Sequence, residues 1–293
     1  MNKGLTITLI VLLSILLAGV VGVMIFLFKG DINFNNFIVA FGESKTLVDE
    51  KEITNIKKLN IEANRADVIV EPKEENTFIK VELYSDHVEE YEITEKEDEI
   101  KVVLKDERFS GFNVKGSRVK IYVPTTYDKD IKVVNKTGDI KIGELSLSNL
   151  NIQLTTGDIT VKEANNVIAS LTTGDVELNN VVKADITGTT GDIDVNNVNN
   201  VKVKLTTGDI TLGEVNGSLN LTSTTGDIEI AKANLTANSS INSGTGDIEI
   251  NKTTGCYIDA KTNIGDTRVN NNDRKSDIVL TITSRVGDIK VNK

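Results

Sequence analysis

The sequence predicts an all-β protein in which a β-solenoid follows an irregular β cap, with one transmembrane helix before both. Three observations lead to this class. A Gly-Asp pair recurs nine times between residue 138 and the C-terminus, apolar side chains keep fixed distances from it, and the 293 residues include 4% aromatics and two prolines. A core without large rings must consist of thin layers of Ile, Val and Leu, as it does in a solenoid.

The Gly-Asp pairs define a structural repeat. Successive glycines are 17 to 22 residues apart, and the stretch 154–161, Leu-Thr-Thr-Gly-Asp-Ile-Thr-Val, is the typical form. We therefore expect about nine coils over residues 131–293. The predicted turn residues are Gly138, Asp139, Gly157, Asp158, Gly174, Asp175, Gly191, Asp192, Gly208, Asp209, Gly226, Asp227, Gly246, Asp247, Gly265, Asp266, Gly287 and Asp288.

Apolar side chains form columns two and four residues after each glycine and five and seven residues before it. Ile159 and Val161 follow Gly157 in this way, while Leu150 and Ile152 precede it. Alternation of apolar and polar residues over such short segments is typical of half-buried strands. Each unit is therefore predicted to contain two strands and two turns.

Neither strand of a unit can bury its apolar face alone, so the units must pack on one another. Stacked coils would place equal positions above equal positions, which explains the clean columns. An antiparallel sandwich with Thr-Thr-Gly-Asp hairpins is the alternative, but it does not require one strand type to keep the same residues. The columns favour the solenoid.

The glycine is predicted to be needed for a left-handed backbone conformation, and the aspartate to accept hydrogen bonds from turn amides. Calcium binding by the stacked carboxylates is the alternative. Each turn supplies one carboxylate and two Thr hydroxyls, whereas calcium takes six to eight oxygen ligands. We therefore expect neither a metal site nor a cofactor.

The N-terminal segment is predicted to anchor the protein in a membrane. Residues 5–28 contain no charge and span about 36 Å as a helix, enough to cross a bilayer. A cleaved signal peptide is the alternative, but its apolar region is shorter. Lys3 before the helix favours a cytoplasmic segment 1–4 and a large extracellular domain. We expect a single-pass protein of the cell membrane.

Residues 29–43 are interpreted as a spacer and residues 44–130 as the irregular β cap. Within the cap, Ala66 and Asp67 resemble a first copy of the repeat with Ala in place of Gly. After Lys29 the chain has 43 acidic and 31 basic residues, a net charge of −12. This charge does not favour nucleic acid as a partner.

Two features near the C-terminus complete the prediction. Cys256, the single cysteine, is interpreted as a buried apolar residue, with a free reactive thiol as the alternative. The chain ends one strand after Gly287 and Asp288. The last coil in the sequence is therefore expected to be the exposed end of the stack, where its edge could pair with another chain. The alternative is that the run 277–283 and the charged cluster 272–275 blunt this end.

The anchor, the irregular β region and the Thr-Thr-Gly-Asp-Ile-x-Val repeats resemble a bacterial family of membrane-anchored "putative adhesins" with β-strand repeats, a domain of unknown function. The resemblance covers about residues 40–293. It implies a cell-surface β-solenoid that acts in adhesion or in envelope sensing. Some members accompany envelope-stress systems of the Lia type. The family offers no catalytic residue.

The sequence thus favours a non-enzymatic protein that presents polar ladders to a cell-wall component, another envelope component or a membrane protein. A regulatory accessory of an envelope-stress system is the alternative function. An enzyme would need acid, base or metal ligands that converge at a break in the repeat. The single histidine, His87, lies in an acidic stretch, and no nucleophile motif or phosphate-binding loop occurs.

Overall fold

The structure is a computed structural model that describes residues 47–53, 57–74, 77–84, 90–105, 117–270 and 275–292. The chain divides into two units, Met1–Lys45 and Thr46–Lys293, and the described residues belong to the second. Segments 1–4 and 5–28, the spacer 29–43 and His87 lie outside them. Within the described ranges, no helix is long and apolar enough to cross a membrane.

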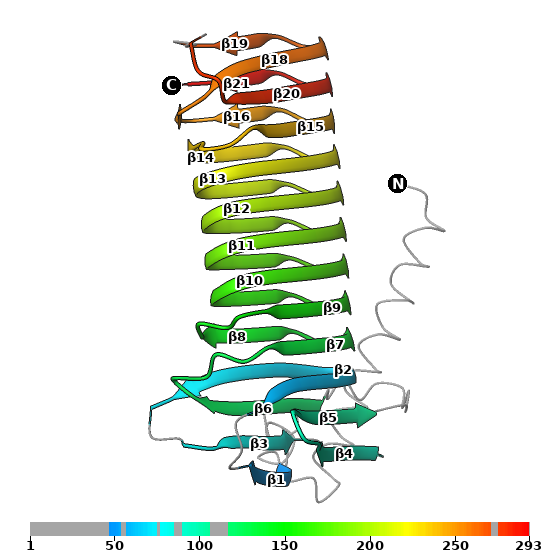
Figure 1. Cartoon of the computed structure of the whole chain (residues 1–293). Helices are drawn as coiled ribbons and strands as arrows, with labels where there is room; N and C mark the ends of the chain where they lie inside the picture. The colour runs from blue at the N-terminus through cyan, green and yellow to red at the C-terminus, as the bar shows by residue number, and fades with distance from the viewer. Residues whose placement is uncertain are drawn as a thin grey trace, which may run out of the picture. The chain divides into compact units, whose positions relative to one another are not determined.

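The described part of the second unit is all-β, as predicted, and its strands form one continuous sheet (Figure 1). The strands before the regular repeats are β1 (Leu47–Ile53), β2 (Lys58–Lys73), β3 (Ile79–Tyr84), β4 (Glu90–Glu95), β5 (Glu99–Lys105) and β6 (Ser117–Pro124). The strands of the repeats are β7 (Ile131–Thr137), β8 (Ile140–Glu144), β9 (Leu150–Thr156), β10 (Ile159–Thr173), β11 (Val176–Thr190), β12 (Ile193–Thr207), β13 (Ile210–Thr225), β14 (Ile228–Asn234), β15 (Ser239–Thr245), β16 (Ile248–Ile250), β17 (Thr253–Thr254), β18 (Tyr257–Ile264), β19 (Thr267–Val269), β20 (Val279–Val286) and β21 (Ile289–Val291).

Parallel pairing in the repeats confirms the solenoid and excludes the sandwich. Ile159 pairs with Val176, Val176 with Ile193, and Ile193 with Ile210, so equal positions lie above one another. A sandwich of hairpins would instead pair neighbouring strands antiparallel. The nine Gly-Asp turns enclose about eight complete turns of the chain, one fewer than the nine coils expected.

The predicted apolar columns form the core. Ile159 and Val161 are fully buried, as are Ile152 and the equivalent residues of the other central coils. A third inward column, three residues before each glycine, was not predicted, because its members share no chemistry. It contains the buried residues Asn135, Leu154, Leu171, Leu205, Ser223, Ser243 and Ser284, and also Gly188.

The strands of the N-terminal region close one end of the stack. The long strand β2 pairs with β5 and β6 on one side and with β7 and β8 on the other. Val68 and Val70 of β2 lie beside Ile140 and Ile142, and Asp67 accepts a hydrogen bond from the Asp139 amide at 3.3 Å. The prediction that Ala66 and Asp67 begin a first copy of the repeat is therefore confirmed.

The cap adds antiparallel strands to this parallel stack. β3 pairs antiparallel with β6 and with β1, and β4 pairs antiparallel with β5. The side chain of Tyr127 is buried, and its hydroxyl donates a hydrogen bond to the Lys57 carbonyl at 2.8 Å. This bond ties the loop after β6 to the start of β2.

The stacking order at the C-terminal end differs from the prediction. β15 and β16 pair with β20 and β21, and these in turn pair with β18 and β19. The coil around Gly287 thus lies between the coils of Gly246 and Gly265, and the expectation that the last coil in sequence is the exposed end is wrong. Figure 1 shows β18 and β19 at the end of the stack opposite β1.

The apolar columns explain this order. Leu280, Ile282, Ile289 and Val291 give the Gly287 coil a complete set of buried side chains. The Gly265 coil has Ala and Thr where its neighbours have Ile, and Thr267 is exposed. An interior coil must bury apolar residues against two neighbours, whereas an end coil needs only one. The less apolar coil therefore occupies the end.

Candidate interaction surface

The predicted Gly-Asp residues line up at one corner of the solenoid. Their glycines have φ values between 119° and 136°, a range that side-chain-bearing residues rarely adopt. Gly138 lies against Ala66, and each of the others lies against the glycine of the adjacent coil. A Cβ at Gly191 would come within 1.9 Å of the Gly174 carbonyl oxygen. The corner therefore requires glycine for two reasons, its backbone conformation and the close approach of the coils.

The aspartates of these turns connect the coils. The Oδ1 atom of each Asp accepts a hydrogen bond from the backbone amide of the Asp in the next stacked coil. The distances are 3.0 Å from Asp175 to Asp158 and 2.8 Å from Asp192 to Asp175. The ladder runs from Asp67 in the cap to Asp266 at the open end, and its bonds measure 2.7–3.3 Å.

This arrangement gives the aspartate column a role in the fold. A carboxylate oxygen that binds the amide of the next coil satisfies a turn donor. Among the residues that the structure describes, no group of three or more His, Cys, Asp or Glu side chains is arranged to hold a metal ion. The corner thus supplies stacking contacts.

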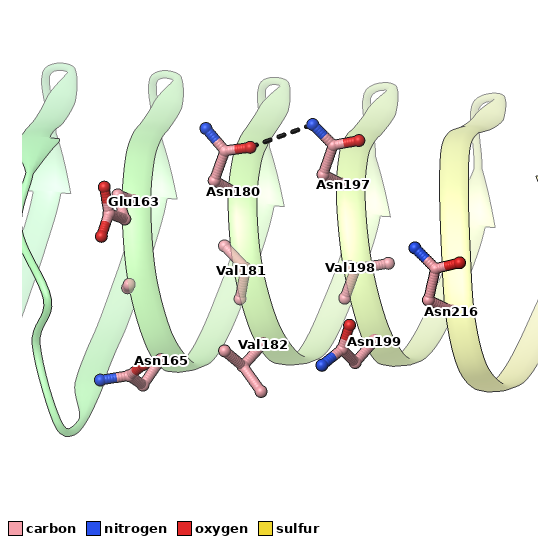
Figure 2. A pocket seen from close by; sticks show the side chains of 10 residues that line it. Glu163, Asn165, Asn180, Val181, Val182, Asn197, Val198, Asn199 and Asn216 are labelled. Atoms are coloured by element: carbon pink, nitrogen blue, oxygen red, sulfur yellow. Dashed lines mark hydrogen bonds between the residues drawn. The ribbon is translucent and has the colours of Figure 1, made fainter.

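A groove lies at the opposite bend of the coils, where β10 to β13 turn from one face of the solenoid to the other (Figure 2). It has a volume of about 280 Å³ and is open to solvent. We call it the bend groove. Its lining residues are Glu163, Ala164, Asn165, Asn180, Val181, Val182, Asn197, Val198, Asn199 and Asn216.

Two rows of polar side chains flank the floor of the bend groove, as Figure 2 shows. Val181 and Val198 are buried and form the floor. In one row Asn197 donates an amide hydrogen bond to Asn180 at 3.0 Å. In the other row Val182 stands between Asn165 and Asn199, and 47% of its surface is exposed. The groove therefore combines amide groups with one accessible apolar contact.

Several amide groups in the bend groove remain available to a ligand. Asn180 accepts from Asn197, but its own NH₂ group makes no hydrogen bond to another described residue. The Asn199 side chain likewise makes none within the described ranges. Because each amide carries two donors and one acceptor, these side chains can bind groups that both donate and accept.

Charges of both signs lie near the groove, since the exposed Lys183 directly follows the lining residue Val182. Glu163 lies in its lining and accepts a hydrogen bond from the Ser146 hydroxyl at 3.1 Å. Glu214, one coil beyond Asn197, accepts from Lys232 at 2.7 Å and from Asn234 at 3.2 Å. These hydrogen bonds and the charge of Lys232 lower the pKa of the Glu214 carboxyl although partial desolvation raises it.

The lining does not offer the groups that hydrolysis requires. Glu163 is its single titratable residue, whereas acid–base cleavage of a glycosidic bond takes two carboxyl groups in most families.

Cys256 lies outside the groove and is buried, with its Sγ atom 3.6 Å from the Thr253 Oγ1 atom, which confirms the buried-thiol interpretation.

Sequence reasoning did not identify the bend groove. Its signal is present as Asn-Asn pairs at 179–180 and 196–197, which lie in the same positions of consecutive coils. The pairs form amide ladders, since Asn196 also donates to Asn179 at 2.7 Å. An Asn-rich segment outside the apolar columns is, however, equally typical of a solvated turn.

A family description named Toastrack DUF4097 matches residues 56–292 of the chain. No curated protein is significantly similar to it. Among solved structures, a "putative adhesin" from Bacteroides fragilis NCTC 9343 is 16% identical, with a TM-score of 0.45 over 85% of this chain and 98% of that chain. A second "putative adhesin", from Parabacteroides merdae ATCC 43184, is 18% identical, with a TM-score of 0.42 over 86% and 98%.

A "putative lipid binding protein" from Parabacteroides distasonis ATCC 8503 is 15% identical, with a TM-score of 0.45 over 84% of this chain and 96% of that chain. Because these TM-scores lie below 0.5, the solved structures carry no inference about function. The family match covers more than half of the chain and is independent of them.

Proposed function

The chain belongs to the Toastrack DUF4097 family, whose function is unknown, and from this premise we propose that it is a non-enzymatic cell-surface β-solenoid whose bend groove binds an N-acetylated glycan of the cell envelope. The observation that carries the proposal is the combination of free asparagine amides with the exposed Val182 in one groove. Along the stack, Asn180 and Asn197 are flanked by Glu163 and Glu214 of the adjacent coils.

The chemistry of the groove fits an N-acetylated sugar. Sugar hydroxyls both donate and accept hydrogen bonds, as do the amides of Asn180 and Asn199. An acetamido group adds one N–H, one carbonyl and a methyl group. The methyl group can pack on Val182, which lies between the amides of Asn165 and Asn199.

The dimensions of the groove favour an extended chain along the axis of the stack. Its lining residues come from four consecutive strands, β10 to β13. At about 4.8 Å per strand, these strands span roughly 15 Å. A polymer running along the axis would meet polar side chains from each of these four strands, and several weak contacts would add up.

A surface location completes the proposal. Residues 5–28 would anchor the chain, with the solenoid outside the cell, and binding of an envelope glycan would serve adhesion or attachment to the wall. Protease added to intact cells should then remove the solenoid and leave a membrane fragment that begins at Met1. A soluble mature form that starts within residues 20–30 would refute the anchor.

A regulatory role beside an envelope-stress system is a second proposal, which rests on the family resemblance. The regulatory role requires the particular sequence of residues 5–28, whereas glycan binding requires only that these residues anchor the chain. Replacing them with an unrelated apolar anchor should preserve glycan binding, whereas regulation through a membrane partner would be lost. The stress response of cells carrying this replacement distinguishes the two roles.

The glycan proposal is tested with the full chain in lipid nanodiscs and a neutral oligomer of N-acetylglucosamine as the probe. Calorimetry should detect binding, and N180A together with N199A should weaken it about tenfold through lost hydrogen bonds. V182N, which makes its row uniformly asparagine, should weaken it about threefold. N166A is the matched control, because Asn166 forms an equivalent amide pair with Asn149 outside the groove.

Equal affinity of V182N, N180A/N199A and N166A for the probe would show that the oligomer binds elsewhere. A complete lack of binding would refute the glycan class. A fully deacetylated oligomer provides a further comparison, because it keeps the hydroxyls but loses the acetamido methyl. We expect its neutral form to bind more weakly than the acetylated oligomer.

A further inference from the structure

The end coil formed by β18 and β19 has an open edge. Within the described ranges, β18 pairs only with β20 and β19 only with β21, so no strand covers their outer sides. The aspartate ladder also ends here, because Asp266 donates its amide to Asp288 but has no further coil above it. Exposed strand edges readily pair with another chain.

The end coil also exposes apolar surface. Ile264 is 65% exposed and pairs with Val286 of the coil below. Ala260 and Val269 belong to the last layer of the core and are only partly covered. The core of the solenoid is therefore not sealed at this end by described residues, whereas the strands of the cap close the other end.

The charges on this edge identify the partner. Asp259 and Lys261 are exposed and point to the same side of β18, one residue apart on either side of Ala260. If a second β18 pairs antiparallel in the register centred on Ala260, Asp259 of each copy faces Lys261 of the other. Registers centred on Asp259 or Lys261 instead place like charges together.

The exposed charges described on β4, an edge strand at the opposite end of the stack, are not self-complementary. The exposed charged residues described on the edge strand β4 are Glu92 and Glu95, both acidic, and Glu95 is already paired with Lys57 at 2.9 Å. The end coil instead has balanced charges, since it also contains Asp266 and Arg268, 3.9 Å apart. Balanced charge and an uncovered core make the C-terminal end the suitable surface for self-association.

We propose that the end coil is a homophilic docking surface, on which the end coil of a second copy pairs antiparallel along β18 in the Ala260-centred register. Such a contact has twofold symmetry and closes at two molecules, because each copy has one such end. The two aspartate–lysine pairs specify the register, and the two incomplete core layers cover each other.

This contact has a consequence for geometry, which rests on the surface location in the proposed function. The described chain begins at β1, at the cap end, and the docking surface lies at the far end of the stack (Figure 1). Two molecules joined by their end coils would have their β1 strands at opposite ends of the joined stack. If each copy is anchored through residues 5–28, the contact would join two facing membranes.

The test uses the full chain in nanodiscs that hold one copy each, with sedimentation velocity to detect joined discs. The wild-type chain should form pairs at a concentration that is then fixed. D259K and K261D should each weaken pairing about tenfold or more, because each replaces two attractive contacts with two repulsive ones. The D259K/K261D double variant should regain pairing, because the charges are exchanged but remain complementary.

A mixture of the two single variants gives a second readout that misfolding cannot imitate. The D259K end coil carries two positive side chains and the K261D end coil two negative ones, so the mixture should pair although neither variant pairs alone. A chain that stays single, or pairs that tolerate D259K, would overturn the proposal. Binding of the N-acetylglucosamine oligomer in the same discs reports on the bend groove independently.

Discussion

The two ends of this solenoid solve the same physical problem in different ways. Every stack of coils leaves unpaired strands and an uncovered core layer at both ends. At the N-terminal end, β3 and β1 add antiparallel strands to β6, and the buried Tyr127 binds the Lys57 carbonyl at the start of β2. At the C-terminal end the described chain adds no cap, and a coil with a weakened apolar column, β18 and β19, lies outermost.

The comparison shows that a repeat protein can end either by covering its last layer or by making that layer more polar. A cap excludes partners from its surface. A polar end coil stays soluble and keeps its edge accessible. The cap covers the first layer of the stack, whereas the polar end coil leaves the strand edge at the other end accessible to a partner.

The largest expected effect comes from the corner glycines at the two ends. G138A introduces a Cβ 2.4 Å from the Ala66 carbonyl oxygen at a φ of 119°, between the cap and the second coil. We expect a loss of about 3 kcal/mol or more in the free energy of unfolding. Urea unfolding followed by circular dichroism measures this loss.

G265A meets an equally close oxygen, Gly287 O at 2.3 Å. Its coil can detach without breaking the rest, so the main transition should move by less than about 1 kcal/mol. Hydrogen exchange should show faster exchange in β18 and β19 alone. Equal losses for G138A and G265A would mean that the open end is as firmly held as the capped one.

The second prediction tests the stacking order at the open end. I282A removes a fully buried side chain of the interior Gly287 coil and should cost about 3 kcal/mol. T267N changes an exposed residue of the end coil and should cost less than about 0.5 kcal/mol. Stacking in the order of the sequence would reverse this ranking, since Thr267 would then lie inside and Ile282 at the end.

The third prediction concerns the capped end. Y127F removes the hydroxyl that donates a hydrogen bond to the Lys57 carbonyl at 2.8 Å, so the carbonyl loses this partner. Because the ring stays in place, the expected cost is about 1 kcal/mol in the free energy of unfolding. Hydrogen exchange should rise at the start of β2 and not in β18. An unchanged exchange rate at β2 would show that the bond does not hold the cap.

The smallest expected effect concerns the pH dependence of the free energy of unfolding, to which a carboxyl group in the cap and one in the middle of the array should contribute differently. Burial alone would raise the pKa of the Glu82 carboxyl, but hydrogen bonds from Lys80 and Tyr84 and nearby positive charges lower it overall. Burial raises the pKa of Asp194, and the charges of Glu177 and Asp192 raise it further. The two groups should therefore influence stability in opposite directions.

The sign follows from linkage between proton binding and folding. Because its pKa is lowered in the folded state, the Glu82 carboxylate stabilises the fold at pH values above its ordinary pKa of 4.5. This stabilisation is lost as the pH falls through the folded-state pKa. A raised pKa means that ionised Asp194 destabilises the fold at neutral pH. E82Q should therefore destabilise and D194N stabilise at pH 7, each by less than about 1 kcal/mol. Both differences should disappear in acid.

A large part of this fold could be predicted from the sequence. The Gly-Asp spacing and the columns around Ile159 and Val161 require stacked strands, because identical positions can share a buried layer only when they lie above one another. The first copy at Ala66 and Asp67 was also visible, since its apolar positions match those of the later repeats. These features are local and periodic.

The candidate sites depend on contacts between coils, which the period alone does not specify. The order of the last two coils was decided by which one, with Thr267 or with Ile289, could be buried on both sides. The bend groove arises because Asn165, Val182 and Asn199 come together only when three coils stack. The repeat in the sequence determines which side chains each coil contains. Packing free energy between coils, summed over the whole stack, decides which coil ends it and which outward side chains share a surface.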